Sequence, residues 1–254
     1  MAEKLLTIGY STLADRVKNI TPSKVDLPHE IFISIQNPSN IEFALPTNFE
    51  FNSLTTNEKG VTKSRNTVLR STKTKYLLFA DDDIEFIGKG IESVVSYLEA
   101  NPNCDLVLAQ VSDADGKLRK AYPKKEEKLT RFNSAKAGTI EMIVRVDSVR
   151  SKSVAFDENF GAGAENYLGD EYIFVTDLLK AGGSATFLPI TIAIHSEDSS
   201  GSRWGTEPDL RVRALVFQRV FGALAPLIRA GFYLKNYRKL GGFKNFANFV
   251  IGKF

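Results

Sequence analysis

Short apolar runs alternate with segments of helical periodicity over most of the chain, which is the pattern of an α/β protein. The apolar runs have the length and composition of buried strands, and they lie at residues 4–9, 30–36, 49–54, 75–80, 104–112 and 184–195. We expect the last run to form a pair of strands. Apolar residues at helical spacing lie at 11–24, 60–71, 87–102 and 170–183. The alternation predicts a mainly parallel sheet covered by helices on both faces.

Two further segments fit around this alternation. Residues 112–135 carry charges and Pro123 without a clear period, so they are expected to form a loop or a peripheral hairpin. Residues 138–150 then predict a strand that leads into a short helix.

The character of the chain changes at about residue 208. No acidic residue follows Asp209, while apolar residues recur at helical intervals beside Arg211, Arg213, Arg219, Arg229, Lys235, Arg238 and Lys239. We therefore expect two parts, a catalytic domain at 1–207 and a basic amphipathic helical tail at 208–254. Two alternatives stay open for the tail. It can lie in an anionic membrane interface, or it can pack on the main domain or on a second subunit of a homo-oligomer.

Composition narrows the class of protein. The 254 residues carry 33 basic and 30 acidic side chains, a balance that does not indicate a nucleic-acid binder. A single cysteine, Cys104, excludes an intrachain disulfide and a cysteine-rich zinc site and suits a reducing cytoplasm. No long uninterrupted apolar stretch and no secretory leader stand out, so we expect a cytoplasmic protein, or one held at the inner face of the cell membrane.

Three adjacent carboxylates, Asp81, Asp82 and Asp83, directly follow the apolar run at 75–80. They therefore lie at the carboxyl end of a strand, where open α/β sheets bind ligands. Three such groups ionise together only beside a counter-charge, and Mg²⁺ or Mn²⁺ takes oxygen ligands of this kind. The alternative is a solvated acidic turn in which Asp82 or Asp83 caps the helix that begins near Ile87.

The residues around this cluster resemble the nucleotide-sugar-dependent glycosyltransferases of the GT-A fold, in particular the inverting family 2. The chain has "GVTKSRNTVLRSTKTKYLLFADDDIEF" from residue 60, "FDENFGAGAENYLGDEYIFVTDLLKAG" from residue 156 and "PITIAIHSEDSSGSRWG" from residue 189. These segments are similar, in the same order, to that family's motifs, and the likeness covers residues 1 to about 205. The resemblance implies a mixed, mainly parallel GT-A sheet flanked by helices, followed by the helical tail.

The resemblance also implies roles on the donor side. Asp81 and Asp83 would serve the ribose and the metal ion, with Asp83 as the direct metal ligand and Asp82 beside them. Arg65 would lie near the base or the diphosphate, although a solvated helix-face charge is the alternative. Gln36 and Asn37 stand where relatives contact the base, usually through an acidic residue, so this departure leaves the nucleotide open. Tyr10 and Ser11 are weaker candidates for nucleotide-sugar binding.

On the acceptor side, the motif's carboxylate pair falls on Asp170 and Glu171, in the reverse of the family's usual order. One of them would take the acceptor proton, and the alignment favours Glu171. Asp170 can instead cap the helix that starts at Glu171. His195 follows the last apolar run, where relatives often bind the metal or diphosphate, and a structural role is its alternative. Arg203 and Trp204 would close a loop over the donor, although Trp204 can equally be a hydrophobic plug.

Together these features predict a metal-dependent, inverting glycosyltransferase with Mn²⁺ or Mg²⁺ as cofactor. Its donor would be a nucleoside-diphosphate sugar, most simply a UDP-sugar, and its acceptor a glycan or lipid-linked hydroxyl in bacterial surface-polysaccharide synthesis. Two alternatives stay open. One is a sugar nucleotidyltransferase, which would need a glycine-rich phosphate loop that the N-terminal region lacks. The other is a non-catalytic sugar-binding scaffold.

Overall fold

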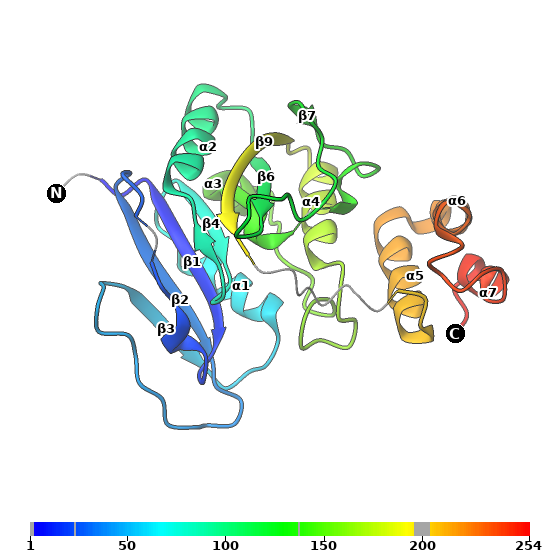
Figure 1. Ribbon diagram of the computed structural model, residues 1–254, viewed down its shortest axis with the longest axis horizontal. Coiled ribbons are helices and arrows are strands. Elements are labelled where there is room, and N and C mark those ends of the chain that lie inside the picture. The colour runs from blue at the N-terminus through cyan, green and yellow to red at the C-terminus, as the bar shows by residue number, and fades with distance from the viewer. Residues whose placement is uncertain (1–2, 23, 137, 196–203) are drawn as a thin grey trace.

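The computed structural model of the protein describes residues 3–22, 24–136, 138–195 and 204–254. Its centre is one mixed sheet with the strand order β3-β2-β1-β4-β8-β6-β9-β5, and β7 pairs with β9 outside this path (Figure 1). The strands are β1 (Leu6–Leu13), β2 (His29–Gln36), β3 (Asn52–Thr56), β4 (Tyr76–Ala80), β5 (Glu85–Phe86), β6 (Leu106–Ser112), β7 (Glu127–Lys128), β8 (Met142–Arg145) and β9 (Ala185–Ile194).

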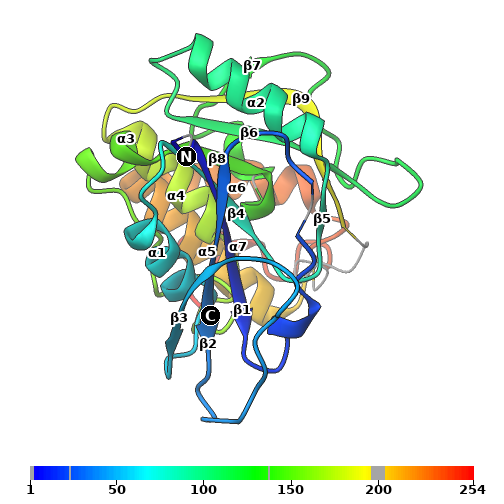
Figure 2. The ribbon, with the colours of Figure 1, turned by 90° about the vertical axis from the view of Figure 1, so that its left-hand side faces the viewer.

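The strands that carry the candidate site are parallel. β3, β2, β1 and β4 run side by side in one direction, so their carboxyl ends meet at one edge of the sheet (Figure 2). β8 is antiparallel to both of its neighbours, and β9 is parallel to β6. The prediction of a mixed α/β sheet is confirmed, with the parallel pairs concentrated in its N-terminal half.

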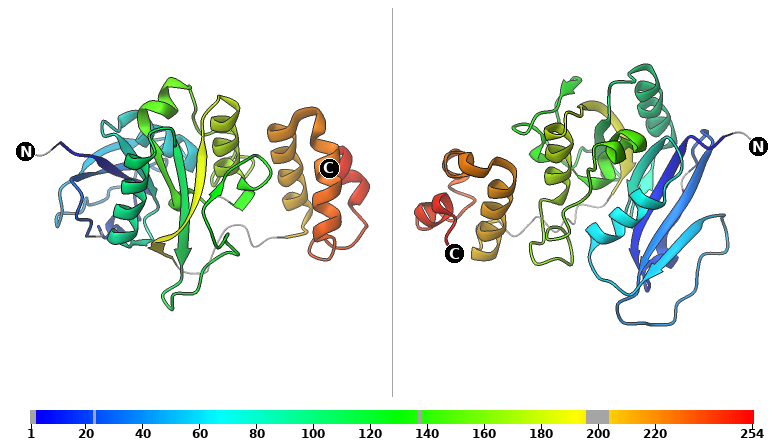
Figure 3. Two further views of the ribbon diagram at one scale, coloured as in Figure 1. Left: turned by 90° about the horizontal axis from the view of Figure 1, so that it is seen from above. Right: turned by 180° about the vertical axis from the view of Figure 1, so that it is seen from behind.

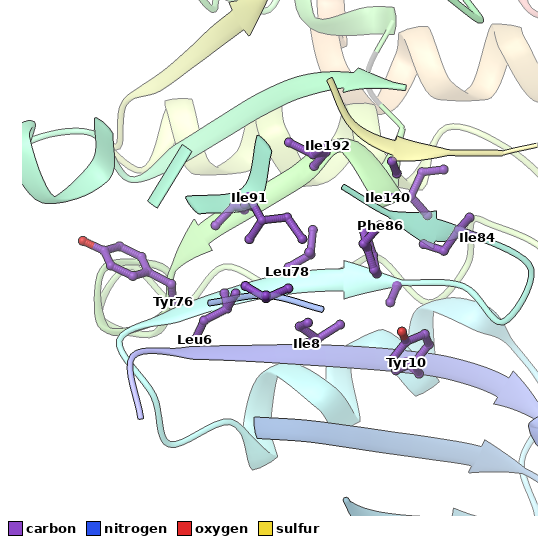
Figure 4. Packing of buried hydrophobic residues seen from close by; sticks show 14 of the residues in the cluster. Leu6, Ile8, Tyr10, Tyr76, Leu78, Ile84, Phe86, Ile91, Ile140 and Ile192 are labelled. Carbon is purple, nitrogen blue, oxygen red and sulfur yellow. The ribbon is translucent and has the colours of Figure 1, made fainter. Parts of the chain in front are cut away.

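Helices cover both faces of the sheet. The helices of the main domain are α1 (Val61–Ser71), α2 (Gly88–Ala100), α3 (Val146–Ser151) and α4 (Asp170–Lys180), with 3-10 turns η2 (Ser134–Lys136) and η3 (Thr139–Glu141). Apolar residues of α2 pack on one face against Leu6, Ile8 and Leu78 (Figure 4). On the other face, α1, α3 and α4 enclose a second core that includes Leu77, Phe79 and Phe174. This division follows from the side-chain alternation along β4.

Two elements differ from the sequence prediction. The helix expected at 11–24 was wrong, because β1 continues to Leu13 in register with β2, and only the 3-10 turn η1 (Val17–Asn19) follows. Val17 and Ile20 are nevertheless buried on the sheet, which explains their spacing. The pair of strands expected at 184–195 was also wrong, because β9 is one continuous strand, which takes up extra residues opposite Gln110 of β6, where the register shifts.

The tail is helical, as expected, and consists of α5 (Glu207–Phe221), the 3-10 turn η5 (Gly222–Leu224), α6 (Ala225–Asn236) and α7 (Phe246–Ile251). Val212 and Val216 of α5 pack against Tyr172 and Ile173 of α4, so the tail lies beside that helix at one end of the molecule (Figure 3). A separate apolar cluster around Tyr233 holds the three tail helices together. The boundary at residue 207 stays a prediction.

Candidate active site

The aspartate cluster lies immediately beyond β4, at the edge where the parallel strands end. Asp82 is buried, whereas the side chains of Asp81 and Asp83 are 35% and 47% exposed. The first and third carboxylates are therefore open to solvent, in a turn between β4 and β5 that covers the second. Helix α2 begins after Ile87 without any side-chain cap. Neither Asp82 nor Asp83 therefore caps this helix, as the alternative of a solvated acidic turn required.

The buried carboxylate of Asp82 is held by the end of β1 and the loop that follows. Thr12 Oγ1 donates a hydrogen bond to Asp82, and Arg16 forms an ion pair with it. Burial raises the pKa of Asp82 to about 6, even though Thr12 and Arg16 favour its charged form. Arg16 also lies 3.1 Å from Asp83 Oδ2, so one guanidinium supplies the counter-charge for two of the three aspartates.

Asp83 and His195 form a pair of potential metal ligands. His195 directly follows β9, and its Nε2 lies 3.3 Å from Asp83 Oδ1. It therefore contacts the aspartate cluster, as the resemblance implied. The hydrogen bond with His195, aided by Arg16, lowers the pKa of Asp83 to about 2. An ionised carboxylate beside an imidazole is a donor set that suits a divalent cation.

The structure also limits what this pair can do alone. Within the described ranges, no group of three or more His, Cys, Asp and Glu side chains is arranged to hold a metal ion. Mg²⁺ usually keeps several water or phosphate ligands and needs only one or two carboxylates from the protein. Asp83 and His195 therefore fit a cation that is shared with a bound diphosphate, and they do not form an all-protein cage.

Arg65 connects the aspartate cluster with the predicted base. It lies on α1 and is 6% exposed, so it is not the solvated charge of the alternative interpretation. Its Nη2 lies 3.3 Å from Asp81 Oδ1, and its Nη1 lies 2.7 Å from Asp170 Oδ2. The charges of Asp81, Asp170 and Glu171 outweigh burial and raise the pKa of Arg65. One fixed cation thus joins both halves of the site.

The carboxylate pair opens helix α4. Gly169, with φ of 97°, precedes the helix and provides no side-chain cap. Asp170 and Glu171 both lie in the first turn of the helix, where the helix dipole favours negative charge. Asp170 therefore does not act as the N-cap residue. Asp170 is 3% exposed, and a side chain at Gly161 would collide with its carboxyl group. Asp170 is enclosed, whereas Glu171 is only partly buried.

The two acids differ in their electrostatic surroundings. Burial, followed by the charge of Glu171, raises the pKa of Asp170 to about 7. Burial alone would also raise the pKa of Glu171, but Arg65, the helix backbone and a hydrogen bond from Thr139 Oγ1 at 2.9 Å outweigh it and lower this pKa. Glu171 is thus the member of the pair that stays ionised near neutral pH.

A hollow of about 690 Å³ adjoins the aspartates. Its lining includes Asp82, Asp83 and His195, together with Asn19 of η1 and Thr21, Pro22 and Lys24 beyond it. Its size lies in the range of small-molecule sites. The candidate metal ligands therefore open into a space that can accept a ligand.

The polar residues at the ends of β1 and β2 support loops. Gln36 Oε1 accepts a hydrogen bond from Gly60 N at 2.8 Å and so holds the start of α1. Asn37 closes its own turn through two hydrogen bonds of 2.9 Å with the backbone of Ile41. Ser11 is buried in β1. Tyr10 packs in the core against Phe86. Contact of these four residues with a nucleotide stays a prediction.

Trp204 is the one of the two predicted closing residues that the structure describes. Arg203 lies outside the described residues. Trp204 stacks on Phe232 of α6 with the Arg213 guanidinium 4.0 Å from its ring centre, so it packs on the tail as the hydrophobic alternative expected. A role of Trp204 in donor binding stays a prediction.

Three contributors were missed by sequence reasoning: Thr12, Arg16 and Thr139. Thr12 and Arg16 belonged to a segment that was predicted as a helix, which hid their position beside the cluster. Thr139 lies in a 3-10 turn, 32 positions from the Glu171 that it contacts, and no local motif marks it. Polar residues just beyond the first strand were the available signal, since strand ends form the ligand-binding edge.

Comparison with known proteins agrees with this arrangement. The family model described as glycosyl transferase family 2 matches residues 41–160, which include Arg65 and the aspartate cluster. A comparison with curated protein sequences gives no match.

The structural comparisons cover most of the chain. The crystal structure of Staphylococcus aureus TarS 1-349 aligns with 96% of this chain and 74% of its own, at 15% identity and a TM-score of 0.62. The same protein in complex with UDP-GlcNAc aligns with 94% of this chain and 74% of its own, at 14% identity and a TM-score of 0.62. A mycobacterial protein aligns with 86% of this chain and 75% of its own, at 13% identity and a TM-score of 0.54.

At these identities the structural likeness establishes the fold, and the family match adds the chemistry. The family match over residues 41–160 and the fold shared with the structural neighbours support a family 2 glycosyltransferase of the GT-A fold. It is an enzyme that uses a nucleotide sugar. The family prediction made from the three sequence motifs is confirmed, and the nucleotidyltransferase and scaffold alternatives lose their support.

Proposed function

We propose that this enzyme inverts the sugar's anomeric carbon as it transfers a hexosyl group from a UDP-sugar to an acceptor hydroxyl, with the help of Mn²⁺ or Mg²⁺. The observation that carries the proposal is the double ion pair of Arg65 with Asp81 and Asp170. It places the donor-side acid and the acceptor-side acids around one buried cation. A donor bound at the aspartates and an acceptor activated at α4 would therefore meet at a fixed distance.

Asp83 and His195 would hold the divalent cation, which supplies positive charge to the diphosphate leaving group. Arg16 lies on the same carboxylate and can offer a second positive charge to the donor. The exposed carboxylate of Asp81 would accept hydrogen bonds from the donor ribose, while Arg65 fixes its position. The donor preference for UDP is supported by the S. aureus structures, which contain UDP and UDP-GlcNAc.

Glu171 would act as the general base. Thr139 donates to its Oε1, and the carboxylate would take the proton of the acceptor hydroxyl as that oxygen attacks the anomeric carbon. The lowered pKa of Glu171 keeps the base ionised before the attack. Asp170 would orient Arg65 from inside the fold and would not touch the acceptor. This assignment resolves the reversed order of the acidic pair in favour of its second member.

We infer an acceptor on a surface glycan or its lipid-linked precursor, handled by a cytoplasmic enzyme at the inner face of the cell membrane. The basic tail supports this placement, because it adjoins α4, the helix that carries the proposed base. The family 2 chemistry is compatible with many acceptors, so the tail is what favours a lipid-linked one.

Donor hydrolysis tests the proposal. Purified enzyme is incubated with UDP-, GDP- and dTDP-sugars in the presence of Mn²⁺, and free nucleoside diphosphate is measured. Slow release of UDP from one UDP-sugar, abolished by EDTA, is the expected result. Release that is unchanged by EDTA, or release from GDP- or dTDP-sugars alone, would contradict the proposed donor and cofactor.

A further inference from the structure

Helix α6 presents apolar side chains to solvent and buries a charged one. Leu224, at the end of η5, and Leu227 and Leu234 are 48%, 71% and 52% exposed. Their spacing of three and seven residues places them on one side of the helix. Arg229 and Tyr233 point the other way and are 3% and 0% exposed. Surface helices of globular proteins normally show the opposite distribution, with the apolar side turned inward.

Specific hydrogen bonds fix this orientation of α6. Arg229 Nε and Nη2 donate to Ala214 O of α5 at 3.0 and 2.6 Å, and Nη1 donates to Val250 O of α7 at 3.3 Å. Tyr233 donates to Gly242 O at 2.8 Å. Rotating the helix to bury the leucines would break these bonds and leave an uncompensated guanidinium. These hydrogen bonds therefore keep the leucines on the solvent-exposed side of α6.

Exposed basic residues lie at the end of α6 and in the segments that follow it. They are Lys235, Arg238, Lys239, Lys244 and Lys253. No acidic residue follows Asp209, so nothing in this part of the sequence neutralises them. Phe243 and Ile251 add further apolar surface and are 61% and 57% exposed. Exposed leucines beside unbalanced positive charge suit a membrane interface, in which anionic headgroups cover an apolar interior.

The geometry favours a helix that lies on a membrane. By length and composition, the 30 residues Glu207–Asn236 could cross one, because an 18-residue window within them has a mean hydropathy of 1.3, although the sequence showed no long uninterrupted apolar run. The chain turns at Gly222, however, and α5 and α6 pack against each other. At 1.5 Å per residue, helices of 15 and 12 residues are each shorter than the roughly 30 Å hydrocarbon core of a bilayer.

We propose that the outer side of α6, formed by Leu224, Leu227 and Leu234 and flanked by Lys235 and Arg238, docks on an anionic lipid surface. The partner is the membrane itself. The tail packs on α4 through α5, so docking would hold the end of α4 that carries Glu171 near the lipid. This last consequence rests on the proposed transfer to a lipid-linked acceptor. The docking itself does not.

Vesicle binding tests the docking independently of turnover. The full chain is sedimented with vesicles of phosphatidylcholine alone and with vesicles that also contain phosphatidylglycerol. We expect binding to the anionic vesicles only, with a decrease at high salt. Trp204 is the single tryptophan and stacks on Phe232 of α6, so its fluorescence should respond to the same vesicles.

Two sets of variants separate the apolar and charged contributions. Leu227→Ser/Leu234→Ser should lower the partition coefficient about tenfold or more, because less apolar surface is removed from water. Lys235→Gln/Arg238→Gln should lower it about fivefold for each charge removed. The matched control is Leu45→Ser/Leu54→Ser, two similarly exposed leucines near β3, at the opposite end of the molecule, and it should bind like wild type.

The outcomes distinguish this proposal from the proposed reaction. The leucine variant should keep the wild-type circular dichroism spectrum and release UDP from a soluble donor at the wild-type rate. Equal binding of the leucine variant and wild type to anionic vesicles would overturn the docking. Dimerisation of wild type through this side of α6, without vesicle binding, would overturn it too, because a second copy would then be the occupant. Neither result would bear on the roles proposed for the catalytic residues.

Discussion

The guanidinium of Arg65 lies 2.7 Å from the carboxylate of Asp170, although 105 positions separate the two residues in the chain. Both side chains are almost fully buried, at 7% and 5% exposed. Such a pair gains strength from its low-dielectric surroundings, but removal of either member leaves an uncompensated charge inside the fold. The contact therefore ties α1 to α4, the helix that carries the proposed base.

Replacement of Arg65 should accordingly destabilise the fold as well as impair transfer. We expect Arg65→Met to lower the free energy of unfolding by about 3–5 kcal/mol, because Asp170 would be left buried and unpaired. Urea denaturation followed by circular dichroism measures this loss. Arg219→Met is the matched control, since Arg219 pairs with Asp177 and Asp157 near the surface and its removal should cost at most about 1 kcal/mol. Equal losses in the two variants would contradict the buried role of Arg65.

The base assignment predicts a separation of binding from turnover. Glu171→Gln keeps the size of the side chain and cannot accept the acceptor proton, so the transfer rate should fall about 10²- to 10⁴-fold with donor affinity retained. Asp170→Asn should keep more of the transfer rate than Glu171→Gln does, because Asp170 acts through Arg65. Steady-state kinetics measure the transfer rate, and calorimetric titration measures the donor affinity. A larger rate loss in Asp170→Asn would reverse the assignment.

The raised pKa of Asp170 predicts a pH dependence of stability. The folded state binds this proton more tightly than the unfolded chain, because the pKa rises from 3.8 to about 7. The resulting contribution is therefore fully present below pH 3.8 and is lost as the pH rises through about 7. As the pH rises from 3.8 to about 7, the free energy of unfolding of wild type should fall relative to that of Asp170→Asn. Urea unfolding across this range measures the difference, and parallel pH profiles would show that Asp170 titrates normally.

Arg16 should compete with a divalent cation for Asp83, because its Nη2 lies 3.1 Å from Asp83 Oδ2. In this solvent-exposed position, loss of one positive charge should strengthen Mn²⁺ binding by about 1 kcal/mol, or about fivefold. Calorimetric titration of Arg16→Gln with Mn²⁺, in the absence of donor, checks this expectation. Weaker Mn²⁺ binding in the variant would show that Arg16 supports the cation site.

The sequence predicted most of the sheet because its strands are buried and their apolar composition reflects that burial. It also placed Asp81, Asp83 and Arg65 on the donor side of one site, because all three belong to motifs that resemble those of the family. The turn after β1 was mistaken for a helix, since Val17 and Ile20 are buried from a loop with helix-like spacing. Contacts such as Thr139 with Glu171 join distant segments, and no local pattern encodes them.

In the proposed mechanism, the aspartate cluster binds the donor through a shared divalent cation held by Asp83 and His195. Calorimetric titration with UDP, in the presence of Mn²⁺ or of EDTA, tests this role of the cation. Wild type and the exposed-loop control Asp115→Ala should bind UDP only with Mn²⁺, and Asp83→Ala should lose this binding. Mn²⁺-dependent binding of UDP to Asp83→Ala with wild-type affinity would contradict this role.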